Sequence, residues 1–228
     1  MLDLMRTTRK RSARLLGTSV LLAAVVGAAG LAGAEPADAT ACGTAILAGT
    51  NCTLTGTASL TGGTLSATFP SALAWSGTLT GLDLNLADMT AAHQSYLVDD
   101  ATGSGAGWRV TVSATQFTTG TATLSNTGTF STNGSTSSIT ATTAPSATCL
   151  TGSTCTLPTN ITTYPVAITT AASSPTTYII YDTSATTGRG SVTIGGTPNP
   201  VGWWLNVPSN ATSGTYTSTV TLAVISGP

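Results

Sequence analysis

Beyond residue 40 the chain alternates apolar and polar residues with a period of two, and no stretch keeps a helical period. Trp108, Val110 and Val112 share one face of such a stretch, and Gly, Pro and Asn interrupt the pattern. Alternation of this kind indicates half-buried strands, and turn signals about every 8–12 residues are typical of sandwiches and barrels. The sequence therefore predicts an all-β fold, an antiparallel β-sandwich of Ig-like or Greek-key type.

The first forty residues have a different composition from the rest. A basic start is followed by an apolar stretch from Leu15 to Val26 and then by small residues that include Ala32-Gly33-Ala34. This order predicts a secretory signal peptide over residues 1–34, with cleavage possible up to residue 39. A membrane anchor is the weaker alternative, because glycines and a cleavage-like end interrupt the apolar stretch. We expect residues 40–228 to form a single sandwich domain with no membrane span after signal removal.

Charged side chains are scarce after the signal peptide. From residue 35 onward seven acidic residues stand against only Arg109 and Arg189, which gives a net charge of −5. Proteins that bind nucleic acids use basic side chains to neutralise phosphates, so this composition disfavours a nucleic-acid partner. The abundant Thr and Ser must supply most of the polar surface.

Four cysteines, Cys42, Cys52, Cys149 and Cys155, lie beyond the signal peptide. An even number in an exported chain favours disulfides. Three pairings are possible, and we prefer the short loops Cys42–Cys52 and Cys149–Cys155, each of which would stabilise the fold by roughly 2–3 kcal/mol. A zinc site is disfavoured, because the intervals are long and the chain has a single histidine.

Groups for catalysis are few. A Ser-His-Asp triad would have to use His93, and no nucleophile-elbow pattern accompanies it. We expect His93 to be half-exposed, and Asp83 and Asp88 to be solvated on the outer face of a strand. Asp99 and Asp100 could hold Ca²⁺ together with turn carbonyls, but a plain hairpin turn is the simpler interpretation. We therefore expect no enzymatic activity, no cofactor and no metal ion.

Two adjacent tryptophans mark the segment 201–208. Neighbouring side chains in a strand face opposite ways, so Trp203 and Leu205 share one face, and Trp204 shares the other with Asn206. We expect Trp203 and Leu205 to be core residues. Trp204 and Asn206 are candidate ligand contacts, because aromatic rings suit the apolar faces of sugars. The alternative, that a loop or a partner chain covers Trp204, stays open.

Two blocks of the sequence resemble the WxL surface domains of Gram-positive bacteria. Residues 98–117 (VDDATGSGAGWRVTVSATQF) resemble the middle of those domains, and residues 207–222 (VPSNATSGTYTSTVTL) resemble their C-terminal strand, before the final SGP. The resemblance implies an all-β exported domain held non-covalently on the cell wall, with peptidoglycan as the ligand. It also makes Trp108 a candidate ligand contact.

The chain departs from the family pattern at the second Trp-x-Leu motif. The first motif falls on Trp108-Arg109-Val110, but the second falls on Leu222-Ala223-Val224, which has no tryptophan. Trp203-Trp204-Leu205 has the right letters but lies one strand earlier. Packing alone also produces such a pattern, and we expect Val110, Leu222 and Val224 to be core residues. For Trp108 both packing and ligand contact stay open.

The leading expectation is a secreted, non-catalytic module that associates with the cell surface through a cell-wall polymer. The alternative is a structural or adhesive subunit that assembles with other exported surface proteins. Thr-rich strands with few charges at their edges can pair edge to edge, which is the physical basis of that alternative.

Overall fold

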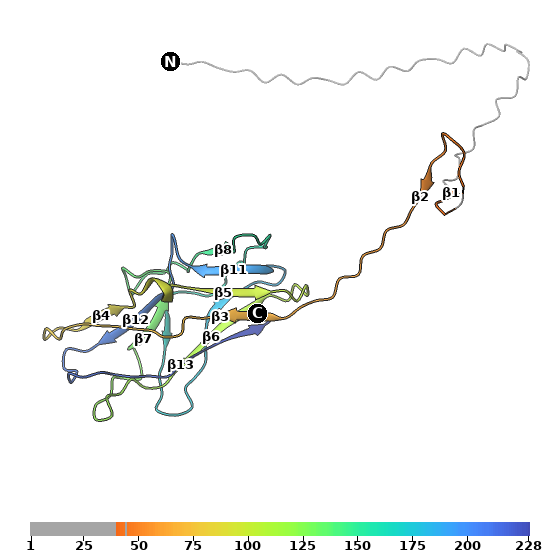
Figure 1. Ribbon diagram of the computed structural model, residues 1–228. Helices are drawn as coiled ribbons and strands as arrows, with labels where there is room; N and C mark the ends of the chain where they lie inside the picture. Colours follow the sequence, from red (N-terminus) through yellow and green to blue (C-terminus); the bar gives the residue numbers. More distant parts are fainter. Residues whose placement is uncertain (1–39, 44) are drawn as a thin grey trace, which may run out of the picture. The chain divides into compact units, whose positions relative to one another are not determined.

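The computed structural model describes residues 40–43 and 45–228 (Figure 1). The chain forms two compact units. The first ends at Ala58, and the second, unit 2, spans Ser59–Pro228. The predicted signal peptide lies outside the described residues. Within the described ranges no helix is long and apolar enough to cross a bilayer.

Both predicted disulfide pairs are present. In the first unit β1 (Thr40–Ala41) and β2 (Cys52–Thr53) pair in parallel, and the Cys42–Cys52 disulfide joins the two ends of this small loop. The Cys149–Cys155 disulfide lies in unit 2, where it closes a loop that follows β8 (Ala147–Cys149). The separations of 10 and 6 residues are those of the two short loops that the sequence favoured.

Unit 2 is all-β, as predicted, and its strands form three antiparallel sheets. A four-stranded sheet has the order β3-β5-β11-β8, with β3 at Leu65–Thr68, β5 at Ser95–Asp100 and β11 at Gly190–Gly195. A second has the order β4-β12-β7-β9, at Leu84–Ala87, Gly202–Val207, Phe130–Asn133 and Val166–Ile168. The third has the order β10-β6-β13, at Tyr178–Asp182, Trp108–Ala114 and Val220–Ser226. The only helical turn described is the 3₁₀ helix η1 (Ala91–His93).

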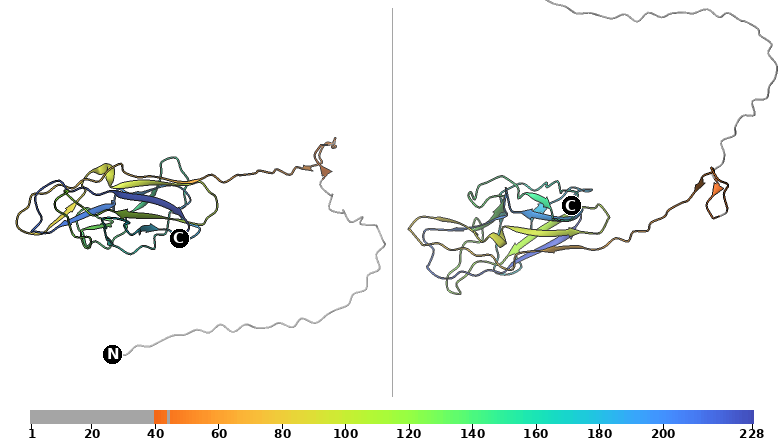
Figure 2. Two further views of the ribbon diagram at one scale, coloured as in Figure 1. Left: turned by 90° about the horizontal axis from the view of Figure 1, so that it is seen from below. Right: turned by 45° about the horizontal axis from the view of Figure 1, so that its top comes forward.

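The strands of unit 2 run lengthwise in packed layers, and loops gather at both ends of the unit (Figure 2). The core lies between the layers and contains Trp108 and Val110 from β6, Val98 from β5, Ile194 from β11 and Trp203 from β12. Aromatic rings connect these elements: Trp108 stacks on Tyr181 with ring centroids 5.6 Å apart, and Phe130 stacks on Trp203 at 6.1 Å. Buried aromatic rings supply much of the apolar area of a core of this size.

Candidate functional site

Trp108, the tryptophan of the first Trp-x-Leu position, lies inside the core and is 0 % exposed. Its indole Nε1 donates a hydrogen bond to Gly188 O at 2.8 Å, and its backbone N–H donates to Thr183 Oγ1 at 2.7 Å. The indole therefore has a complete set of partners inside the protein. Of the two roles that the sequence left open for Trp108, the structure shows packing, because the ring is enclosed by its own fold.

The outer positions of both motifs, and the Trp203-Trp204-Leu205 segment at its first and third residues, also face inward. Val110 and Trp203 are fully buried, and Leu205 is buried. In β13, Leu222 and Val224 are half-buried and pack against the core, whereas Ala223 between them is exposed. Leu222 and Val224 lie opposite Val112 and Val110 of β6. The second motif position thus contributes to packing although its tryptophan is missing.

Trp204 faces away from Trp203, as alternation requires, but it is only 5 % exposed. Its Nε1 donates to Ser135 O at 2.8 Å and lies 3.2 Å from Asn133 Oδ1. The loop after β7 therefore covers the indole. Gly202 permits this, because a Cβ at that position would overlap the Ser135 carbonyl. Of the two possibilities that the sequence left open, the covering loop is the one observed.

Trp204 nevertheless lines an open cavity of about 600 Å³, which we call the Trp204 pocket. The pocket is lined by hydroxyl, amide, thioether and aliphatic side chains. None of these side chains is charged. The lining residues are Ser76, Asn85, Leu86, Ala87, Met89, Thr136, Ser137, Ser138, Ile139 and Trp204. Asn206 lies beside the pocket, where its Nδ2 donates to Asn85 Oδ1 at 2.7 Å.

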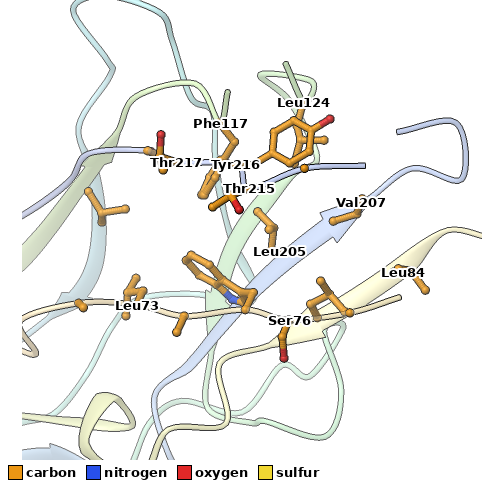
Figure 3. A pocket seen from close by; sticks show the side chains of 18 of the residues that line it. Leu73, Ser76, Leu84, Phe117, Leu124, Leu205, Val207, Thr215, Tyr216 and Thr217 are labelled. Carbon is orange, nitrogen blue, oxygen red and sulfur yellow. The ribbon is translucent and has the colours of Figure 1, made fainter. Parts of the chain in front are cut away.

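A larger cavity of about 1100 Å³, which we call the long groove, lies between two extended segments (Figure 3). Residues 70–79 form one side and residues 212–220 form the other. Leu205 and Val207 of β12 lie between the two sides, with Phe117 and Leu124 nearby (Figure 3). None of the residues that line the long groove is charged. Its volume lies slightly above the range of about 300–1,000 Å³ that small-molecule sites occupy.

Asp88 holds the wall of the long groove in place. Its carboxylate accepts hydrogen bonds from Ala74 N at 2.8 Å and Thr90 N at 2.9 Å, and lies 2.7 Å from His93 Nδ1. Trp75 Nε1 adds a second attachment through Trp203 O at 3.0 Å. Asp88 is 0 % exposed, so the expectation of a solvated outer-face carboxylate was wrong.

Burial and these hydrogen bonds shift the pKa of the Asp88 carboxyl group in opposite directions. Burial alone raises the pKa of a carboxyl group, because it disfavours the charged form. The hydrogen bonds from Ala74, Thr90 and His93 act in the opposite direction and prevail, so the pKa of Asp88 lies below its ordinary value. The side chain is thus an anion at neutral pH, held by three donors.

Asp99 and Asp100 follow one another in β5 and point to opposite faces of the sheet. Asp100 Oδ1 accepts hydrogen bonds from Thr102 N at 3.0 Å and Thr102 Oγ1 at 2.6 Å, so it closes the turn that follows the strand. Among the described residues, no three acidic, histidine or cysteine side chains gather into a cluster that could hold a metal ion.

Sequence reasoning missed Trp75 and Asp88 as parts of a site. Trp75 lies in a segment without regular secondary structure, but its ring packs edge-on against Phe117 and Phe130 with centroids 5.7 and 5.8 Å apart. The only signal for Asp88 is a lone acidic residue five positions before the single histidine. That spacing becomes a contact only because η1 turns the chain back toward β4.

Comparison with known proteins gives one match. A model of the WxL domain, a surface cell wall-binding domain, matches residues 79–228. The matched region contains ten of the thirteen described strands, β4 to β13, and both Trp-x-Leu positions. No curated protein and no solved structure matches the chain.

Proposed function

The chain belongs to the WxL domain family of surface cell wall-binding proteins, and from this premise we propose that it is a secreted, non-catalytic module that attaches non-covalently to peptidoglycan. The family supports an association with the cell wall at the cell surface. The proposal adds the ligand, the type of attachment and the place of contact on the protein.

We assign the polymer contact to the Trp204 pocket. Its hydroxyl and amide groups can both donate and accept hydrogen bonds, which suits a ligand covered with hydroxyl and acetamido groups. The Met89 side chain, which is 68 % exposed, supplies most of the apolar surface for the faces of sugar rings, and the small part of Trp204 that the loop leaves uncovered adds to it. The observation that carries the proposal is this neutral combination of indole, amide and hydroxyl groups on an open surface.

The charge distribution supports the same ligand class. With no charged residue in the pocket, binding should depend on hydrogen bonds and apolar contacts and should change little with ionic strength. The net charge of −5 from residue 35 onward disfavours anionic wall polymers, because like charges repel. A neutral glycan surface is the part of the wall that this negatively charged protein approaches with the least electrostatic repulsion.

Sedimentation of the mature chain with purified peptidoglycan tests the proposal. The double variant N85A/M89A removes two exposed pocket side chains and should lower the bound fraction several-fold, while the thermal unfolding temperature stays close to that of the wild type. Leu82→Ala is the matched control, since Leu82 is 72 % exposed and lines neither cavity. Equal binding by all three proteins would contradict the assignment of the pocket, and absence of binding by the wild type would contradict the proposed function.

A further inference from the structure

The two sides of the long groove are backbone segments with unused hydrogen-bonding groups. Across residues 70–82 of the described chain no backbone-to-backbone hydrogen bond is present, and the one backbone donor with a partner is Ala74, which bonds to the Asp88 carboxylate. Most of these residues are exposed, so their backbone groups bond to water, which a strand added here would replace.

The opposite side is a strand edge. Thr217 exchanges two hydrogen bonds with Thr118, and Thr219 O accepts from Thr115 N. In an antiparallel ladder the residues between such pairs direct their N–H and C=O groups the other way. The backbone groups of Tyr216 and Ser218 therefore point away from the ladder. No charged residue or proline protects this edge, which is how exposed edges are usually kept from pairing.

One segment of the chain has the alternating sequence of a strand but pairs with no other strand in the described structure. In residues 54–61 (LTGTASLT), which follow β2, Leu54, Ala58 and Leu60 alternate with threonine, serine and one glycine. From Leu54 onward no strand is assigned before Leu65, and Leu54 is 83 % and Leu60 96 % exposed. An alternating segment with uncharged, proline-free sequence is suited to strand addition, in which backbone hydrogen bonds give affinity and alternate side chains fill pockets.

We propose that residues 54–61 of one copy bind as an additional strand in the long groove of a second copy of this chain. Leu54 and Leu60 face the groove about 20 Å apart along the added strand, so one of them packs on Leu205 and Val207 of the groove floor and the other lies farther along the groove. The small residues between them allow the backbones to approach closely. The backbone of the added strand bonds to the free edge at Tyr216 and Ser218. Both the segment and the groove are uncharged, so no charge is buried on association.

The geometry of β3 requires that the groove belong to another copy. Gly63 N donates to Ala101 O at 2.8 Å and Ala101 N donates to Thr64 O at 3.2 Å, so the chain is already paired with β5 at these positions. A hairpin at Gly62-Gly63 would place Leu60 opposite Leu65, beside β3. The groove begins at Pro70, so the same hairpin would bring Leu54, opposite Ser71, to the groove of its own chain but would leave Leu60 beside β3. A groove that takes both leucines therefore belongs to another copy.

Sedimentation velocity of the mature chain over a wide concentration range tests this inference. The wild-type mass should rise with concentration, and the double variant L54D/L60D should remain a monomer. We expect association to weaken by about a hundredfold or more, because carboxylates resist transfer into an apolar groove. The matched control L47D/L82D adds the same charge at two other exposed leucines and should assemble like the wild type.

A mixing experiment identifies the two partners of the contact. Ser218→Pro removes a free N–H from the groove edge without breaking a backbone bond of the ladder, but it also removes the hydroxyl that donates to Thr115 O at 2.6 Å. Ser218→Ala removes the hydroxyl alone and should assemble like the wild type. S218P and L54D/L60D should each be monomeric alone, but their mixture should form a complex between an intact segment and an intact groove. A wild-type chain that stays monomeric at every concentration, or L54D/L60D that assembles like the wild type, would overturn the inference. The inference is independent of the Trp204 pocket, so either can fail without the other.

Discussion

Replacing Asp88 by asparagine removes a buried charge with almost no change in side-chain size. The carboxylate now has three donors: Ala74 N and His93 Nδ1 at one oxygen, and Thr90 N at the other. An amide presents a single oxygen, so at least one donor loses its acceptor. An unpaired buried donor costs about 1–3 kcal/mol, and each hydrogen bond to a charged group contributes about 1.5–3 kcal/mol. We therefore expect D88N to lower the free energy of unfolding of unit 2 by about 2–4 kcal/mol.

The effect of D88N should depend on pH in a defined direction. The folded-state pKa of Asp88 lies below the ordinary value of 3.8. A group with a depressed pKa stabilises the folded state fully above its unfolded pKa, and this contribution is lost as the pH falls through the folded-state value. The difference in stability between wild type and D88N should therefore be constant from about pH 5 to 7 and should shrink below about pH 4.

Urea and thermal unfolding followed by circular dichroism measure this difference. For a unit of this size the expected loss corresponds to a fall of about 5–15 °C in the unfolding temperature. Asp83→Asn is the matched control, because it makes the same chemical change at an exposed carboxylate that accepts one bond, from Ser209 N at 2.7 Å. D83N should cost about 1 kcal/mol or less. If D88N unfolds within about 2 °C of the wild type, or if D83N loses as much, the role given to Asp88 is wrong.

Two further changes test the packing around the motif and the division into units. Gly188→Ala should destabilise unit 2 by about 1–3 kcal/mol in urea unfolding, because Gly188 has φ +76° and a Cβ would lie 2.7 Å from Trp108 Nε1. Gly196→Ala has nearly the same φ but nothing within 4 Å, so a loss equal to that of Gly188→Ala would rule out the contact as the cause. Removing the Cys149–Cys155 disulfide with two serines should cost about 2 kcal/mol in unit 2. The same change at Cys42 and Cys52 should leave the unfolding of unit 2 unchanged, and a shared loss would show that the first unit contributes to its stability.

Strand periodicity was the most reliable guide to the fold. The alternation around Trp108 predicted an inward face for Val110 and Val112, and all three are fully buried in β6. The same rule placed Trp203 and Trp204 on opposite faces of β12. Strand faces follow from the sequence because successive side chains must point in opposite directions whatever surrounds them. The disulfide pairs were also predictable, since short loops close at low entropic cost.

The candidate sites were much less predictable. The burial of Trp204 depends on a loop 69 residues earlier, whose Ser135 carbonyl reaches the indole. Residues 70–79 contain apolar side chains but form no strand, and Asp88 attaches this segment through a backbone N–H at Ala74. Such contacts join residues far apart in the chain. A single sequence contains no local signal for them.

The sequence by itself determined the all-β class, the strand faces and the disulfide pairs, and its resemblance to WxL domains identified the family that the comparison confirmed. These properties follow from local alternation, chain separation and short motifs. Only the tertiary structure decided which outward side chains are covered, as Trp204 is, and which acidic residue is buried, as Asp88 is. Exposure and ionisation depend on the elements that meet in space, so they are settled by packing and not by the order of residues along the chain.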